Sequence, residues 1–284
     1  MWKHVILSNR LFMVALAVFF LIIAFGLIGP FITRHPLDEV RGEDGRRLIR
    51  HPPTLELPLG TDDFGFDVFA QLAHAVGNSL FVGFFAGSIV VLIAVSIGAF
   101  GTFRGGYLEE ALMLITNIVI VLPVFPILLV LAAYLDERSL LLVGLIIAGI
   151  SWPWAARGIR SQVLSLKERD FVRLARVSGM RDINIAFQEI LPNMFAYILL
   201  VMAIATGGAI VAEAGISMLG LGPDPQQYVT LGTMLYWAIQ NETIRSGFWW
   251  LYLPPGLIIT FFWMALYIIH ANMDEVFNPR LRRR

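Results

Sequence analysis

Six apolar runs, each close to the length of a membrane-spanning helix, divide this 284-residue chain. An α-helix needs about 20 apolar residues to cross about 30 Å of hydrocarbon. Spanning β-strands are a poor alternative, because no ten-residue segments alternate between polar and apolar residues. We therefore predict an all-α membrane protein with six transmembrane helices. The predicted spans cover about 11–33, 76–103, 108–135, 140–157, 193–217 and 249–271.

Composition agrees with this reading. The chain is 57% hydrophobic and only 15% charged, whereas a soluble domain is about a quarter charged. Little sequence remains outside the spans, so residues 1–284 are expected to form a single transmembrane domain. A net charge of zero gives no reason to expect a nucleic-acid partner. The absence of cysteine excludes disulfides and thiolate metal sites within the chain.

The distribution of charge predicts the orientation. With the N-terminus inside, the inner segments carry 14 basic and eight acidic groups, and the outer segments carry seven basic and twelve acidic groups. Positive charge gathers on the cytoplasmic side of membrane proteins. We therefore expect a multi-pass protein of the cell (plasma or inner) membrane with both termini in the cytoplasm. Residues 34–75 form a long outer loop, and residues 158–192 form a long cytoplasmic loop. The tail, Arg280 to Arg284, is a positive anchor on anionic lipid.

The cytoplasmic loop contains a patterned segment. Apolar or small residues recur at helical spacing in two sets, which are Phe171, Leu174, Ala175 and Ser178, and then Ile183, Ala186, Phe187 and Ile190. Gly179 follows the first set, where a left-handed residue ends a helix at low cost. Asp182 precedes the second set and is expected to cap it, and Pro192 suits the first turn of the fifth span. These signals predict a compact knob made of helix, glycine turn and helix. The simpler alternative is an interfacial amphipathic connector.

Seven short motifs, taken in order, resemble those of a known family. The glycine and the Leu-Pro pair of the knob keep the spacing of the "EAA" loop of type I ABC importer permeases. The motifs are LGTDDFGFD (59–67), GNSLFVG (77–83), RGGYLEE (104–110), SWPWAARGIRSQVLSLKERDFV (151–172), EILPN (189–193), EAGISMLGLG (213–222) and NPRLR (278–282). The resemblance is to the dipeptide/oligopeptide permease family, and most closely to its C-type subunit.

The sequence departs from this family at a few positions. The glutamate and the first alanine of the EAA triplet align with Arg173 and Leu174, and only Ala175 is retained. Phe66 stands where the outer motif commonly has arginine, and Asn278 replaces the aspartate of the usual Asp-Pro. We expect the fold to survive these changes and the surface met by Arg173 to differ locally.

The resemblance implies a division of labour. The knob would couple this chain to ATPase subunits, and the expected contact residues are Arg173, Leu174, Ala175, Ser178, Gly179, Met180 and Arg181. The sequence has no Gly-Lys pair and hence no Walker A loop, so ATP and Mg²⁺ are expected on two separate ATPase subunits. No cofactor is expected in this chain. Further expected partners are a homologous second permease subunit, an extracytoplasmic substrate-binding protein and the lipid membrane.

Several functional alternatives remain. The family implies alternating-access import of dipeptides or oligopeptides, and related importers carry oligosaccharides or nickel. An ATP-independent channel or secondary carrier is the alternative from another class. An enzyme is not expected, because the five histidines are scattered and neither H-E-x-x-H nor G-x-S-x-G occurs.

Two further features have competing interpretations. Glu213 is an acid in an apolar context, which suggests a place on the translocation path or in a gate. A capping or packing role near the outer end of the fifth span explains it equally well. An aromatic cluster near the outer surface is more typical of an interfacial belt than of a sugar-binding site. Its members are Tyr228, Tyr236, Trp237, Phe248, Trp249 and Trp250.

Overall fold

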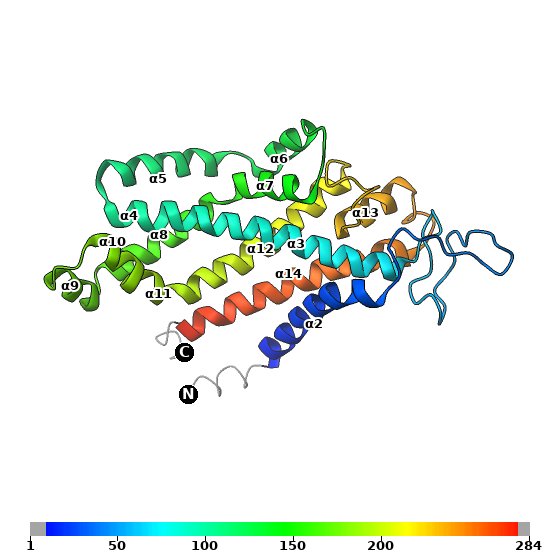
Figure 1. Ribbon diagram of the computed structural model, residues 1–284, viewed down its shortest axis with the longest axis horizontal. Helices are drawn as coiled ribbons and strands as arrows, with labels where there is room; N and C mark the ends of the chain where they lie inside the picture. The colour runs from blue at the N-terminus through cyan, green and yellow to red at the C-terminus, as the bar shows by residue number, and fades with distance from the viewer. Residues whose placement is uncertain (1–9, 278–284) are drawn as a thin grey trace.

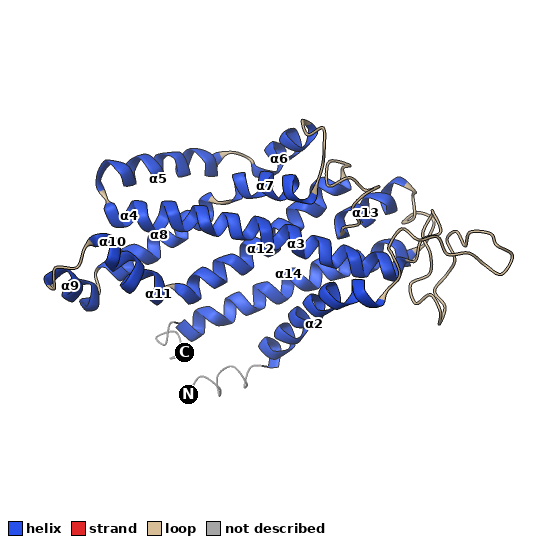
Figure 2. Ribbon diagram, viewed as in Figure 1, coloured by secondary structure: helices blue, strands red, loops and turns tan. Residues whose placement is uncertain are grey.

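The computed structural model describes residues 10–277, with side chains as far as residue 272. Long helices run side by side along the molecule, and most of the loop structure gathers at one end (Figures 1 and 2). Between residues 10 and 277, β structure is limited to three isolated bridges. The elements are α2 (Arg10–Ile32), α3 (Val68–Val95), the π-helix η1 (Ser96–Gly101), α4 (Thr102–Arg104), α5 (Gly106–Val121), α6 (Val124–Ala133), α7 (Leu140–Ser151), α8 (Pro153–Lys167), α9 (Asp170–Val177), α10 (Asp182–Ile185), the π-helix η2 (Ala186–Ile190), α11 (Leu191–Asn193), α12 (Phe195–Met218), α13 (Leu231–Gln240) and α14 (Trp249–Phe277).

Four helical stretches in the described part of the chain are long and apolar enough to cross a membrane, and there are six if each of two bent pairs forms one span. The prediction of six spans agrees with the larger count. The second span starts earlier than predicted, at Val68, because the Asp67 carboxylate caps it by accepting from the backbone N–H groups of Phe69 and Ala70. The predicted outer loop 34–75 is shortened accordingly.

The third and fourth predicted spans are both bent. Helices α5 and α6 meet at 84°, and α7 and α8 meet at 51°. The first break falls at Leu122, which has extended backbone (ψ 136°) before Pro123, as expected for a residue that precedes proline. The second break is the kink predicted at Trp152-Pro153. Helix α8 then runs on to Lys167, so the first third of the predicted cytoplasmic loop is helical.

Close approach of α3 to α12 forms the centre of the bundle. A Cβ added at Gly83 would lie 2.8 Å from the Thr206 carbonyl oxygen, and one at Gly87 would lie 3.0 Å from the Thr206 backbone nitrogen. Small residues let helices pack this tightly within a membrane, where dispersion contacts replace hydrophobic burial as the driving force. The main core cluster extends from this contact to α7, α8 and the segment of α9 and α10.

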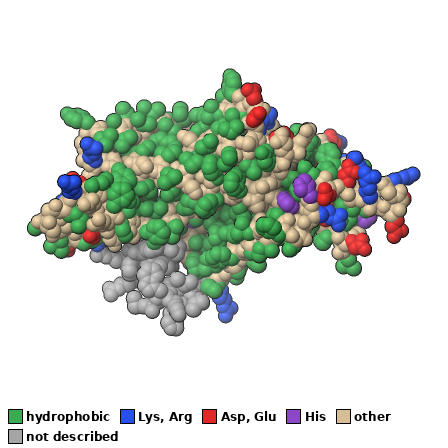
Figure 3. All heavy atoms as spheres, in the orientation of Figure 1, with side chains coloured by type: hydrophobic (Ala, Val, Ile, Leu, Met, Phe, Trp, Pro, Cys, Tyr) green, Lys and Arg blue, Asp and Glu red, His purple; other side chains and the backbone are tan. Residues whose placement is uncertain are grey.

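The two ends of the molecule differ from its middle. In the face shown in Figure 3, apolar side chains cover the body, and charged side chains gather toward the ends. The start of α2 and the last turns of α14 lie toward the same end as α9 and α10 (Figure 1). The described part of the chain therefore begins and ends toward the same end of the molecule. The predicted basic tail, 280–284, lies outside the described residues.

Candidate functional site: a helix–glycine–helix knob

The predicted knob forms, and backbone geometry explains its turn. Helix α9 ends at Val177, and Gly179 follows with φ +77°. The Gly179 N–H donates to the Arg176 carbonyl at 3.0 Å, and the Met180 N–H donates to the Ala175 carbonyl at 3.1 Å. These two bonds define a Schellman motif, which needs a left-handed residue and therefore favours glycine. Prediction of this glycine turn is confirmed.

The second half of the knob differs in detail. Asp182 was predicted to cap the next helix, but Arg181 occupies the N-cap position without a side-chain bond, and Asp182 is the first helical residue of α10. The prediction of an Asp182 cap is therefore wrong. A carboxylate in the first turn still interacts favourably with the helix dipole. Helix α10, η2 and α11 then lead through Pro192 into α12.

Burial divides the knob into an inner and an outer side. Val172, Ala175 and Ile185 are buried against the body. Leu174, Val177 and Ile183 are 66%, 87% and 51% exposed. The predicted apolar face of Phe171, Leu174, Ala175 and Ser178 is thus split, since Ala175 is buried and Phe171 half-buried, whereas Leu174 and Ser178 are exposed. An apolar tip at the polar end of a membrane protein needs a partner surface.

The residues predicted to contact an ATPase follow the same division. Arg173, Leu174, Ser178, Gly179 and Arg181 are exposed, Met180 is half-buried, and Ala175 is buried. The structure therefore brings most of this set to one outer surface. Arg173 lies 3.5 Å from the Glu168 carboxylate, and because both side chains are exposed this ion pair stabilises the knob little.

Lys167, the last residue of α8 before the knob, binds the end of the second span. Its ammonium donates to the carbonyls of Thr102 and Phe103 at 2.9 and 3.4 Å. It also lies 5.3 Å from the centre of the Phe103 ring, and the Arg176 guanidinium lies 5.8 Å from the same ring. A cation interacts favourably with the dipole at a helix C-terminus and with the face of an aromatic ring. Sequence reasoning missed Lys167, although its place at the end of an amphipathic helix was a usable signal.

Glu213 occupies a closed hydroxyl cluster. Its side chain is fully buried. One carboxylate oxygen accepts from Ser217 and from Thr230, each at 2.7 Å, and the other accepts from Ser79 at 3.4 Å. Thr230 is also the N-cap of α13 and forms a capping box with Thr233. The acid therefore joins α3, α12 and α13, as the packing interpretation requires. Its role in a path or gate stays a prediction.

Comparison with known proteins places the chain in a family. A family described as "Binding-protein-dependent transport system inner membrane component" matches residues 90–283. The chain belongs to this family. It is therefore an ABC importer permease of the type I fold, as the sequence motifs indicated. A second family, "N-terminal TM domain of oligopeptide transport permease C", matches residues 1–53.

Curated relatives match the permease over nearly its whole length. The dipeptide transport system permease protein DppC of Bacillus subtilis (strain 168) is 29% identical over 99% of this chain and 85% of its own. The oligopeptide transport system permease protein OppC of the same organism is 30% identical over 100% of this chain and 91% of its own. The oligopeptide transport system permease protein OppC of Mycobacterium bovis is 27% identical over 97% of this chain and 92% of its own. These names describe transport subunits rather than catalysts, in agreement with the prediction that the permease is not an enzyme.

The two bent spans of the permease border one apolar crevice. A cavity of about 300 Å³ lies between the breaks, and it is lined by Val124, Pro153, Trp154, Gly208 and Trp263 among others. Non-helical backbone at membrane depth is tolerated only inside protein or beside a water-filled space. The exposed break at Leu122 and Val124, which are 43% and 40% exposed, therefore belongs on a face that lipid does not cover.

Proposed function

We propose that this permease is the C-type subunit of an ATP-driven importer of dipeptides or oligopeptides, and that it forms half of the translocation pathway. The proposal draws its substrate class from the relatives named as dipeptide and oligopeptide permeases. The observation that carries the coupling mechanism is the exposed apolar tip of a rigid helix–glycine–helix knob on a chain of this family.

In this proposal the knob sits in a groove of an ATPase subunit. Leu174, Val177 and Ile183 supply the apolar contact, while Arg173 and Arg181 supply charge. ATP and Mg²⁺ are bound by two ATPase subunits, and this chain holds no cofactor. When these subunits close, α10 and α11 move α12, and Lys167 moves the end of α4. Rigid-body motion of packed elements then switches the spans between inward-open and outward-open states.

The pathway lies between this permease and a homologous second subunit. Helix α5 supports this placement, because Thr116 is its only buried residue, and its apolar side chains need cover. The break between α5 and α6 and the crevice beside it face the same interface. Discontinuous helices are typical of substrate paths in transporters.

An extracytoplasmic binding protein delivers the solute to the opposite end, where the loop of residues 34–67 lies. This requires the permease to lie in the cell membrane with the knob and both termini inside. The absence of cysteine makes the topology directly testable. A cysteine at Glu43 is expected to react with an impermeant maleimide from outside, and one at Arg181 only after permeabilisation. The reverse pattern contradicts the orientation.

Uptake by the purified complex in proteoliposomes tests the function itself. We expect ATP-dependent uptake of a labelled dipeptide that requires the binding protein. Uptake of a disaccharide or Ni²⁺ in place of peptide contradicts the substrate assignment. Solute flux through this chain without ATPase subunits contradicts the importer and supports a channel or secondary carrier.

A further inference from the structure

The outer loop contains a half-buried carboxylate without a positive partner, that of Asp62. Asp63 pairs with the Arg50 guanidinium, and Asp67 lies 3.5 Å from that of Arg34. Among the described residues, Asp62 has no such ion pair. Its carboxylate instead accepts from the backbone N–H groups of Phe64 and Phe66 at 2.9 and 2.8 Å. It also accepts from the Gln71 side-chain amide at 2.9 Å.

These donors do not replace a counter-charge. Burial raises the pKa of the Asp62 carboxyl, although the hydrogen bonds from Phe66, Phe64 and Gln71 act in the opposite direction. A desolvated carboxylate without a cation is costly, and a cation placed beside it recovers that cost. Each carboxylate oxygen has two acceptor sites, so the oxygen that accepts from Gln71 retains one for a ligand.

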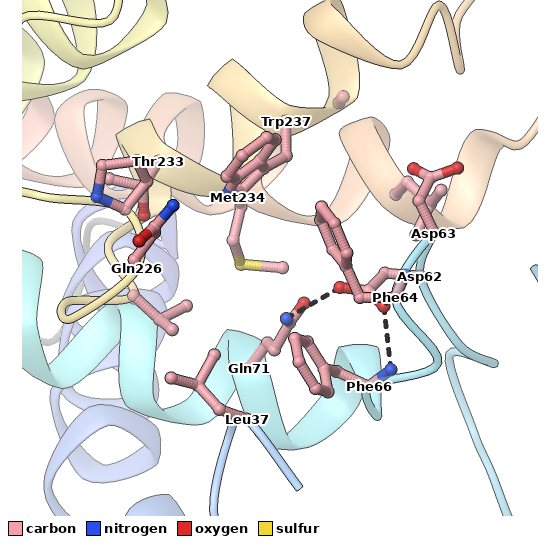
Figure 4. Close-up of a pocket in the computed structure, with 14 residues that line it drawn as sticks. Leu37, Asp62, Asp63, Phe64, Phe66, Gln71, Gln226, Thr233, Met234 and Trp237 are labelled. Atoms are coloured by element: carbon pink, nitrogen blue, oxygen red, sulfur yellow. Dashed lines mark hydrogen bonds between the residues drawn. The ribbon is translucent and has the colours of Figure 1, made fainter. Parts of the chain in front are cut away.

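Asp62 lines a cavity walled by aromatic side chains. Phe64 and Phe66 come from the outer loop, and Met234 and Trp237 face them from α13 (Figure 4). The Phe64 ring centre lies 5.1 Å from that of Trp237 and 5.9 Å from that of Phe66. Aromatic faces beside a carboxylate are the chemistry that binds organic cations. The cavity has a volume of about 250 Å³, which is room for about eight water molecules or one long side chain.

We infer that this cavity binds the alkyl-guanidinium or alkyl-ammonium group of a single Arg or Lys side chain presented by the extracytoplasmic binding protein. The assignment of this cationic side chain to the binding protein rests on the proposed function. The cavity lies at the loop-rich end, opposite the knob (Figure 1), and the outer segments carry twelve acidic and seven basic groups.

A small-molecule probe tests the chemistry of the cavity. Because the chain has no cysteine, Gln226→Cys places a single thiol at the cavity wall. We expect n-butylguanidinium to slow its maleimide labelling more than neutral n-butylurea does. Gln227→Cys, which lines only the neighbouring cavity, is the matched control and is expected to label at an unchanged rate. Equal protection by the two probes overturns the inference.

Two substitutions separate charge from shape. In Asp62→Asn the amide oxygen keeps the bonds from Phe64 and Phe66, and the Gln71 amide accepts after turning over. This variant is expected to raise the half-protecting concentration of n-butylguanidinium about tenfold, as for loss of a charged hydrogen-bond partner. Phe66→Arg supplies a guanidinium within the chain and is expected to abolish protection. If n-butylguanidinium protects the thiol equally well with and without Asp62→Asn, and both proteins elute as intact complexes, the inference is overturned.

The assembled importer tests the source of the cation. Binding protein is expected to slow Gln226→Cys labelling, and Asp62→Asn is expected to raise the concentration of binding protein that half-stimulates ATP hydrolysis. An unchanged half-stimulating concentration, together with intact n-butylguanidinium protection, overturns the assignment to the binding protein. Absence of any stimulation in the unmodified complex instead counts against the proposed function and leaves the probe result standing.

Discussion

The substitution Gly179→Val tests whether the shape of the knob matters for coupling. Gly179 has φ +77°, and an added Cβ meets no atom within 4 Å. The cost of valine is therefore backbone strain rather than a clash, and a β-branched residue in this region costs about 1–3 kcal/mol. The turn is held by two backbone hydrogen bonds, each with a net contribution of about 1 kcal/mol.

Strain and stabilisation are thus of similar size, so valine shifts the knob toward conformations in which α10 no longer follows α9. A change of about 2 kcal/mol alters the population of the intact turn about 30-fold. Uptake and ATP hydrolysis measured in the same proteoliposomes report the result. We expect peptide taken up per ATP to fall about tenfold or more, with membrane insertion and ATP hydrolysis retained.

Gly247→Val is the matched control for this experiment. Gly247 has φ +79° and also has no atom within 4 Å of an added Cβ, but it precedes α14 at the other end of the molecule. The Gly247→Val substitution introduces the same kind of backbone strain away from the knob and is expected to leave coupling intact. Normal uptake per ATP in Gly179→Val, or an equal loss in Gly247→Val, refutes the reasoning.

Three further predictions concern single side chains. Glu213→Leu removes the acceptor of the Ser217 and Thr230 hydroxyls, which costs about 2–4 kcal/mol and is expected to lower the melting temperature in detergent by about 5–10 °C. Glu213→Gln keeps one acceptor oxygen and is expected to melt like the unmodified protein, so equal losses in both variants contradict the hydroxyl-cluster interpretation. The pKa of Asp62 is raised in the folded state, so its ionised form destabilises the outer loop, and this penalty disappears as pH falls through the folded pKa. Asp62→Asn is therefore expected to slow hydrogen exchange of the loop at neutral pH, with a difference that shrinks on acidification; a difference independent of pH contradicts this. Lys167→Met is expected to reduce uptake per ATP, because it frees the knob from α4, and unchanged coupling in reconstituted vesicles counts against that link.

Hydropathy and spacing were sufficient to predict the helical membrane fold and the knob. Apolar runs report where a helix is stable in lipid, and the glycine with flanking helical periodicity reports a turn. Hydropathy could not reveal the 84° bend between α5 and α6, because Leu122 and Pro123 are themselves apolar. The proline was a usable signal of a break, but the size of the angle depends on packing.

The environment of the polar residues was less predictable. Glu213 meets Ser79 and Thr230, which are distant in sequence, so only the assembled bundle shows that its partners are hydroxyls. Helix α13 was not predicted, since ten residues with a threonine capping box give a weak local signal. The orientation of α9 was also missed at Leu174, because an eight-residue helix takes its buried face from its neighbours.

Contact between the knob and an ATPase subunit is the central claim, and site-specific cross-linking tests it most directly. Val177 is the most exposed apolar residue of the knob, at 87%, and in this cysteine-free chain Val177→Cys carries a single photoactivatable cross-linker. Tyr134→Cys, at an 83% exposed position beyond α6, is the control. We predict that the cross-linker at residue 177 captures an ATPase subunit in the assembled, transporting complex and that the one at residue 134 does not. Capture from residue 134 alone, or from neither position while uptake proceeds, contradicts the claim.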